Sequence, residues 1–190
     1  MRRRFLHADV LTRLPSFTRI TRAAFAAALL MPVSASAQDV TEPALKAAFI
    51  YNFAKFTEWP PEIARITGPL ALCVVGDTAV GEALARTVKD RELNGRRIAV
   101  SVLGVAEPQR GCHILYVSGV TSGQATLLVA GLRDLPVLTI SDAEGFMALG
   151  GIAQFFFEHG RLRFSVHLGS AKRARLQLSS RLLALAKPHD

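Results

Sequence analysis

The stretch LALCVVGD, residues 70–77, decides the fold of this 190-residue chain. Its six apolar residues have the length of a buried strand, and the Gly76-Asp77 pair closes the run. The next segment, residues 79–89, has the pattern of a helix. A buried strand that leads directly into a helix is typical of an α/β domain.

The same alternation continues along the chain in both directions. Further strands are predicted at residues 97–103, 113–117, 136–140, 152–158 and 161–167. Further helices are predicted at residues 42–56, 122–134 and 170–187. Trp59-Pro60-Pro61 is expected to end the first helix, and His159-Gly160 to form a tight turn between the last two strands. We therefore predict an α/β fold: a single compact domain with a mixed β-sheet flanked by helices, and a C-terminal helix after a β-hairpin.

The first 37 residues have the three parts of a secretory signal peptide. Six arginines give a basic start, residues 23–33 form an apolar run of 11 residues, and Ala35-Ser36-Ala37 has the small residues that signal peptidase reads. The alternative is a membrane anchor, but a spanning helix needs about 20 apolar residues. We expect residues 1–37 to be a signal peptide cleaved after Ala37, and residues 38–190 to be a periplasmic domain.

Most of the net charge belongs to this leader. The whole chain has 23 Lys and Arg against 15 Asp and Glu, and the leader holds six of the arginines and one acid. Residues 38–190 keep 17 basic and 14 acidic residues, a net charge of +3. A nucleic-acid partner is therefore not expected.

Both cysteines, Cys73 and Cys112, lie in the mature part. In an oxidising compartment an even pair is a candidate disulfide. The alternative is two buried thiols. A bond that closes a loop of this length would stabilise the fold by roughly 3–4 kcal/mol.

No motif typical of a catalytic, cofactor or metal site is found, so none is expected. The histidines of the mature part are isolated and lack the spacing of metal ligands. The glycine-rich stretch at residues 145–151 lacks a dinucleotide fingerprint, and Asp142 before it is interpreted as a helix cap. An enzyme would need a site assembled from distant residues such as His113 or His167.

Two surfaces are candidates for binding a partner. The first helix and the residues after it carry aromatic side chains on nearly all sides, as in a helix that is either buried or shared with a partner. The last helix carries a basic run, which either faces solvent or docks an acidic partner or anionic lipid. The candidate residues are Phe49, Tyr51, Phe56, Trp59, Lys172, Arg173 and Arg175.

Three segments are specific as an ordered set: KAAFIYNFAKFTEWP at residues 46–60, VLTISD at residues 137–142, and RLRF at residues 161–164 followed by LSSRLLALA at residues 178–186. In this order, from about Pro43 to Lys187, they resemble the YfiR-like family of periplasmic proteins. The resemblance implies an α/β regulatory binding protein, not an enzyme, that commonly forms a homodimer. The type member represses a membrane-bound diguanylate cyclase through its periplasmic sensor domain, and an outer-membrane lipoprotein sequesters the repressor.

The resemblance also assigns roles to the cysteines. Cys73 and Cys112 are similar to the family's structural disulfide pair. Relatives can carry a second pair, tied to redox control, near what are here Met147 and Gln154. Its absence argues against a redox switch.

Two residues near the C-terminus depart from the family's pattern. His167 stands where relatives tend to have Asn, and Arg175 stands where they tend to have Gly. If this region contacts a partner, we expect these two residues to change that contact relative to other family members.

The function implied is repression of a membrane signalling protein, first of all a diguanylate cyclase, which lowers cyclic di-GMP and biofilm formation. Some family members go with sensor kinases. The alternative function is a periplasmic small-ligand-binding protein that serves a sensor kinase or a transport system.

Overall fold

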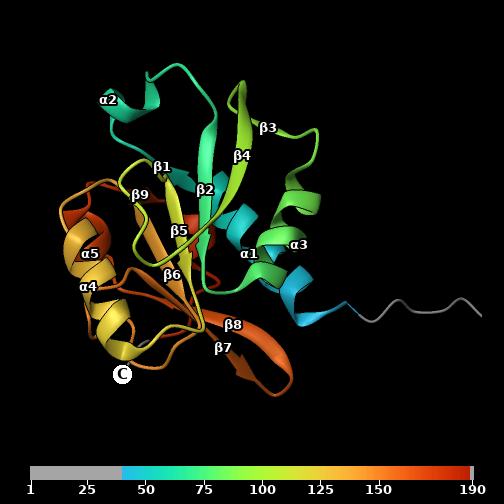
Figure 1. Cartoon of the computed structure of the whole chain (residues 1–190), viewed down its shortest axis with the longest axis vertical. Coiled ribbons are helices and arrows are strands. Elements are labelled where there is room, and N and C mark those ends of the chain that lie inside the picture. Colours follow the sequence, from blue (N-terminus) through green and yellow to red (C-terminus); the bar gives the residue numbers. More distant parts are fainter. Residues whose placement is uncertain (1–39, 189–190) are drawn as a thin grey trace, which may run out of the picture. The chain divides into compact units, whose positions relative to one another are not determined.

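The computed structural model describes residues 40–188, so the predicted signal peptide and its cleavage after Ala37 lie outside the described residues. The helices are α1 (Glu42–Lys55), α2 (Pro61–Ala64), α3 (Thr78–Val88), α4 (Ser122–Leu132), α5 (Leu168–Arg173) and α6 (Ser180–Leu183) (Figure 1). The strands are β1 (Thr57–Glu58), β2 (Leu70–Val75), β3 (Glu92–Leu93), β4 (Arg96–Leu103), β5 (Ile114–Val117), β6 (Leu138–Ser141), β7 (Ala153–Glu158), β8 (Arg161–Val166) and β9 (Gln177–Leu178). None of the helices within residues 40–188 is long and apolar enough to cross a membrane.

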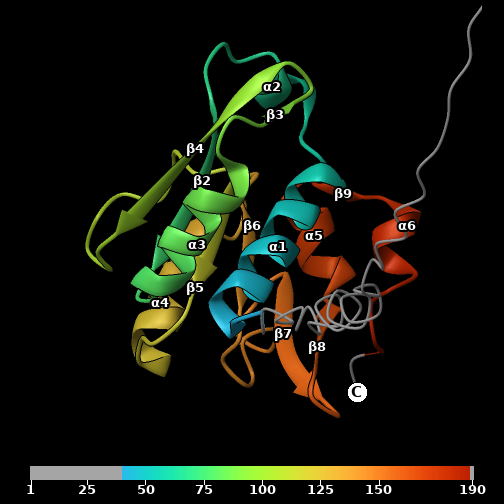
Figure 2. The ribbon, with the colours of Figure 1, turned by 90° about the vertical axis from the view of Figure 1, so that its right-hand side faces the viewer.

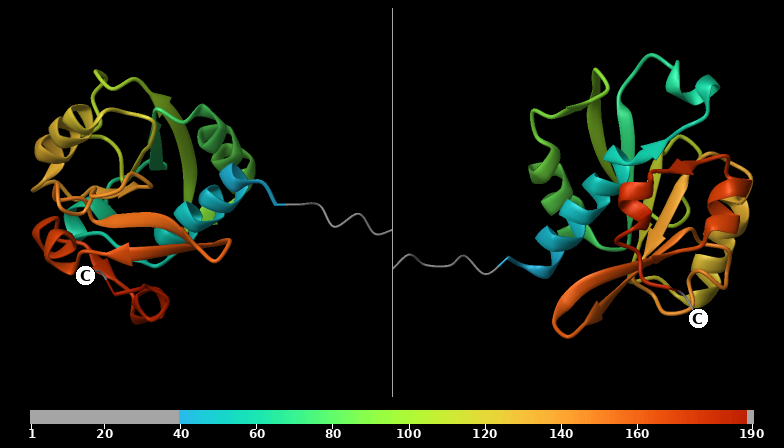
Figure 3. Two further views of the ribbon diagram at one scale, coloured as in Figure 1. Left: turned by 90° about the horizontal axis from the view of Figure 1, so that it is seen from below. Right: turned by 180° about the vertical axis from the view of Figure 1, so that it is seen from behind.

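Seven strands form one mixed sheet in the order β3-β4-β2-β5-β6-β7-β8. Neighbours from β4 to β7 run parallel, whereas the edge strands β3 and β8 pair antiparallel with β4 and β7. The sheet is strongly curved when seen from below (Figure 3, left). The predicted α/β class with a mixed sheet is confirmed.

Helices cover both faces of the sheet. In β2, Leu72 and Val74 belong to the core cluster that packs under α1 and α3, and Cys73 and Val75 belong to the cluster under α4. Alternation along the strand therefore supplies both cores. Figure 2 shows α1 and α3 side by side on the near face, with α4 on the opposite face. Cys73 and Cys112 are joined by a disulfide on the α4 side, with their Cα atoms 5.9 Å apart.

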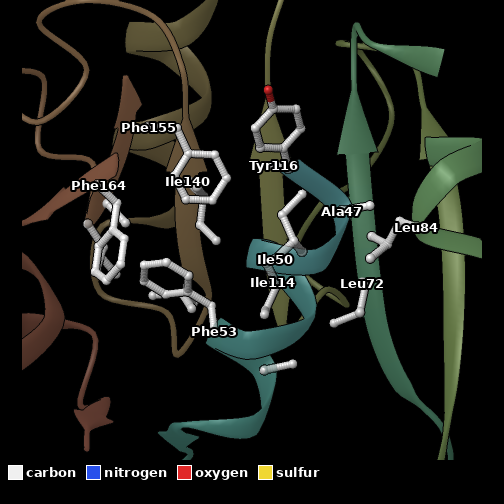
Figure 4. Close-up of a cluster of buried hydrophobic side chains, with 14 of the residues drawn as sticks. Ala47, Ile50, Phe53, Leu72, Leu84, Ile114, Tyr116, Ile140, Phe155 and Phe164 are labelled. Atoms are coloured by element: carbon white, nitrogen blue, oxygen red, sulfur yellow. The ribbon is translucent and has the colours of Figure 1, made fainter. Parts of the chain in front are cut away.

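Aromatic rings fasten α1 to the C-terminal hairpin. Phe53 of α1 is fully buried and its ring lies 5.0 Å from the ring of Phe164 in an edge-on arrangement. Its neighbour Phe155 completes the cluster (Figure 4). Phe49, half-buried, packs edge-on against the same two rings. Each such pair adds about 0.5–1.5 kcal/mol beyond the area it buries.

A buried ion pair fixes the start of α1 at the carboxyl end of the parallel strands. The Lys46 ammonium lies 2.5 Å from carboxylate oxygens of both Asp142 and Glu42. Burial opposes the charge of Lys46, but the hydrogen bonds to these two carboxylates outweigh it and raise its pKa. Burial likewise opposes the charge of Asp142, but the hydrogen bond and charge of Lys46, together with hydrogen bonds from Ser118 and Tyr116, outweigh it and lower the pKa of Asp142. The interpretation of Asp142 as a helix cap was wrong, because the side chain binds Lys46 and no helix starts at this position.

The first predicted helix agrees with the structure to within one residue, whereas the last one does not. The first helix ends at Lys55, before the Trp59-Pro60-Pro61 triplet, and β1 follows. The helix predicted over residues 170–187 is broken into α5, β9 and α6. The break occurs at Arg175, whose φ of 56° is left-handed and cannot continue an α-helix.

The β7–β8 hairpin turns at His159-Gly160, as predicted, with φ values of 51° and 72°. Two consecutive positive φ angles match the twist of a two-residue hairpin. Beyond the hairpin, the chain returns along β8: the backbone amide of Lys187 donates to the carbonyl of Phe164 at 2.8 Å. The segment that ends at Lys187 therefore covers part of the outer edge of β8.

Candidate partner-binding surface

An open groove of about 540 Å³ lies where the segment after α1 meets the C-terminal segment. We call it the Trp59 groove; it is lined by residues 58–61, 168, 171–172 and 175–178. It contains Trp59, Lys172 and Arg175, which were predicted from two distant parts of the sequence. The structure thus brings together three of the seven candidate residues.

A small second sheet builds the groove. β1 and β9 pair antiparallel, with Thr57 opposite Leu178 and Glu58 opposite Gln177. The amide of Ser179 extends the pairing by donating to the carbonyl of Phe56 at 2.9 Å. These bonds fix the chain on either side of the groove, so its two walls are set by backbone pairing.

Local geometry at the ends of α5 places the basic side chains. His167 caps the helix, because its Nδ1 accepts a hydrogen bond of 3.0 Å from the amide of Ser170. An Asn at this position would use its side-chain oxygen in the same way. At the other end, Arg175 adopts the positive φ that Gly takes most easily. This explains why Gly is expected there and shows that Arg is held under some strain.

The two basic side chains of the groove, Arg175 and Lys172, differ in whether they have an ion-pair partner. Arg175 forms an ion pair with Glu62, which lies 113 residues away along the chain. A hydrogen bond from its own backbone amide, together with Arg175, lowers the pKa of the Glu62 carboxyl. Lys172 is exposed and has no acidic group within ion-pair distance among residues 40–188. It is therefore the free cation of this groove.

Trp59 forms the apolar part of the groove. Its ring is half-buried and also packs edge-on against His113, with the ring centres 5.8 Å apart. The adjacent Pro60 and Pro61 continue the apolar lining. The groove therefore presents an aromatic surface beside one free and one paired cation, an arrangement suited to binding rather than to covalent chemistry.

The other four candidate residues lie elsewhere. Phe49 belongs to the aromatic cluster under α1, and Phe56 caps the end of that helix. Tyr51 is covered by cations, with Arg91 5.0 Å and Lys55 5.8 Å from the ring centre. Arg173 turns back on its own helix and donates to the Ser170 hydroxyl at 2.8 Å. None of these lines the Trp59 groove.

Sequence reasoning missed two features, the ion pair between Arg175 and Glu62 and the strand β9. Both depend on contacts between segments more than 100 residues apart, for which the sequence carries no local signal. Within the described part of the chain, no cluster of three or more His, Cys, Asp or Glu side chains is placed to hold a metal ion.

One comparison with known proteins bears on identity. A family model described as YfiR/HmsC-like matches residues 43–187. The match starts in the first turn of α1 and runs beyond α6, so it includes both walls of the Trp59 groove, the disulfide and the whole seven-stranded sheet. The chain belongs to the YfiR/HmsC-like family.

Proposed function

We propose that this protein is a periplasmic regulator that represses a membrane-bound diguanylate cyclase by binding its periplasmic sensor domain. Family membership supports the class of function. The observation that carries the proposal for this chain is the Trp59 groove, which joins an exposed cation to a half-buried indole. Repression of this kind lowers cyclic di-GMP and biofilm formation.

The groove indicates what the partner presents. Lys172 is unpaired within the described residues, and Arg175 can exchange its contact with Glu62 for a carboxylate of the partner. An aromatic residue with an adjacent Arg is typical of the few residues that dominate a binding interface. We therefore expect an acidic segment with at least one apolar side chain to contact Trp59.

The first test is deletion of the gene, with cellular cyclic di-GMP as the measurement. We expect a rise that the wild-type gene reverses. No rise would exclude repression of a diguanylate cyclase and direct the search to sensor kinases.

A second step tests the groove. Lys172→Glu is expected to leave cyclic di-GMP high in the deletion strain, because it repels an acidic partner. The matched control is Lys89→Glu, which reverses the charge of another exposed lysine, at the end of α3. If Lys172→Glu represses as well as the control at equal protein level, the groove is not the interface.

We further propose that the protein is a homodimer and that an outer-membrane lipoprotein sequesters it. Light scattering coupled to size exclusion measures the first property. Co-purification from outer-membrane extracts measures the second. A monomer at micromolar concentration would contradict the first proposal.

A further inference from the structure

A second cavity lies at the amino-terminal end of the parallel strands. Its volume is about 550 Å³, within the range of roughly 300–1,000 Å³ that is common for small-molecule sites. Its lining includes the starts of β2 and β4, the residue before β5, and the loop between α2 and β2. We call it the His113 cavity, after the buried histidine in its wall.

The hydrogen bonds of His113 fix its tautomer. Its Nδ1 accepts a hydrogen bond of 3.1 Å from the backbone amide of Ala71. A neutral imidazole has only one acceptor nitrogen, so Nε2 carries the hydrogen. Burial, with a smaller effect of the Arg96 charge, lowers the pKa of His113 to about 4, so the ring is neutral near pH 7.

This tautomer leaves two donors facing each other. Nη2 of Arg96 lies 3.2 Å from Nε2 of His113, and both nitrogens carry hydrogen. The guanidinium cannot turn away easily, because Nε and Nη2 donate to the carbonyls of Gly68 and Pro69 at 3.0 and 3.1 Å. An acceptor beside this pair, within hydrogen-bond distance of both nitrogens, would satisfy both donors.

The cavity is positive and partly apolar. Arg110 supplies a second guanidinium, and neither Arg96 nor Arg110 has an acidic group within ion-pair distance among residues 40–188. The rest of the wall includes Ile66 and Val137. Ile66 is 52% exposed and therefore offers apolar surface that a ligand can cover.

We propose that the His113 cavity binds a small organic carboxylate, whose oxygens accept hydrogen bonds from Arg96, Arg110 and Nε2 of His113. The apolar body of this ligand packs against Ile66 and Val137. Guanidinium groups and carboxylates match in charge and geometry, so the acid group supplies the missing acceptor. This inference stands independently of the proposed repression of a cyclase.

Trp59 provides the measurement. It is the only tryptophan of the chain and its ring contacts His113, so ligand binding is expected to change its fluorescence. The probe is octanoate, titrated into protein produced from the full-length gene, with calorimetry as a second readout. Octan-1-ol, which has the same apolar body without the charge, is the ligand control.

We expect saturable binding of octanoate that is at least tenfold tighter than that of octanol. Arg110→Gln, at an exposed position, should weaken octanoate binding at least fivefold without loss of folding. The matched control Arg97→Gln changes an exposed arginine next to Arg96 in sequence that does not line the cavity, and it should bind as the wild type does.

Three results would overturn the proposal: no saturable binding of octanoate, equal affinity for octanol, or equal affinity in Arg110→Gln. Loss of binding in Lys172→Gln with retention in Arg110→Gln would also overturn it, since the ligand would then occupy the Trp59 groove.

Discussion

Acid is expected to destabilise this fold between about pH 6.5 and pH 4 through His113. The residue is only 9% exposed, and burial with the Arg96 charge lowers its pKa from 6.5 to about 4. Above pH 6.5 the ring is neutral in both the folded and unfolded chain, so it adds no pH dependence. Below pH 6.5 the histidine is protonated in the unfolded chain but stays neutral in the folded chain. The free energy of unfolding therefore falls with pH until the pH reaches the folded pKa.

The size of the effect follows from the difference between the two pKa values. At about 1.4 kcal/mol for each pH unit, the free energy of unfolding should fall by about 3 kcal/mol between pH 7 and pH 4 through this residue. Carboxylates also begin to titrate in this range, so the histidine's share needs a variant that cannot titrate. His113→Asn is suitable, because its side-chain oxygen can replace Nδ1 as acceptor for the Ala71 amide.

The assay is urea unfolding of the wild type and His113→Asn at several pH values, in buffers free of carboxylates. The wild type should lose about 3 kcal/mol more than the variant over this range. His159→Asn, in the exposed hairpin turn, is the control and should follow the wild type. Parallel curves for the wild type and His113→Asn would refute the reasoning.

Three further predictions concern stability. Asp142→Asn should lower the free energy of unfolding by about 2 kcal/mol, less than the roughly 3–5 kcal/mol of a fully buried pair because Glu42 still faces Lys46; an unchanged urea midpoint would contradict it. Replacing both cysteines of the Cys73–Cys112 bond by Ala should cost about 3–4 kcal/mol, and an equal melting temperature of the wild type with and without reductant would contradict a stabilising bond. Arg175→Gly should leave the free energy of unfolding unchanged or raise it by up to about 1 kcal/mol, because relief of the left-handed conformation offsets the lost surface ion pair. Arg175→Val, which introduces a β-branched side chain, should lower it. Calorimetric melting measures both variants, and a higher melting temperature for Arg175→Val than for Arg175→Gly would contradict the prediction.

The sequence was sufficient for the parts of the fold that depend on local pattern. β2 could be predicted because its six apolar residues allow no exposed face, and the hairpin because strand alternation flanks His159-Gly160. The prediction of one continuous C-terminal helix was wrong for a physical reason. The segment after Arg175 has the apolar spacing of a helix, but pairing with β1 and the burial of Leu176 outweigh local preference.

The candidate surface was predictable only in part. Trp59 and Lys172 could be selected as an aromatic and a basic residue, but nothing in the sequence brings them to one groove. The facing donors of Arg96 and His113 were also out of reach, because a tautomer is set by a backbone amide that only the folded chain supplies.

The return of the chain along β8 matters for how this protein is handled. An uncovered sheet edge offers unpaired amides and carbonyls to any other edge, including that of a second copy. A version shortened before Lys187 would lose the amide that bonds Phe164 and the ammonium that lies 3.2 Å from Glu158. Such a version would expose an unpaired edge of β8 that can pair with another chain. Any dimer that it formed could therefore arise from the truncation alone. The oligomeric state should therefore be measured on a chain whose C-terminal end is intact and carries no added tag.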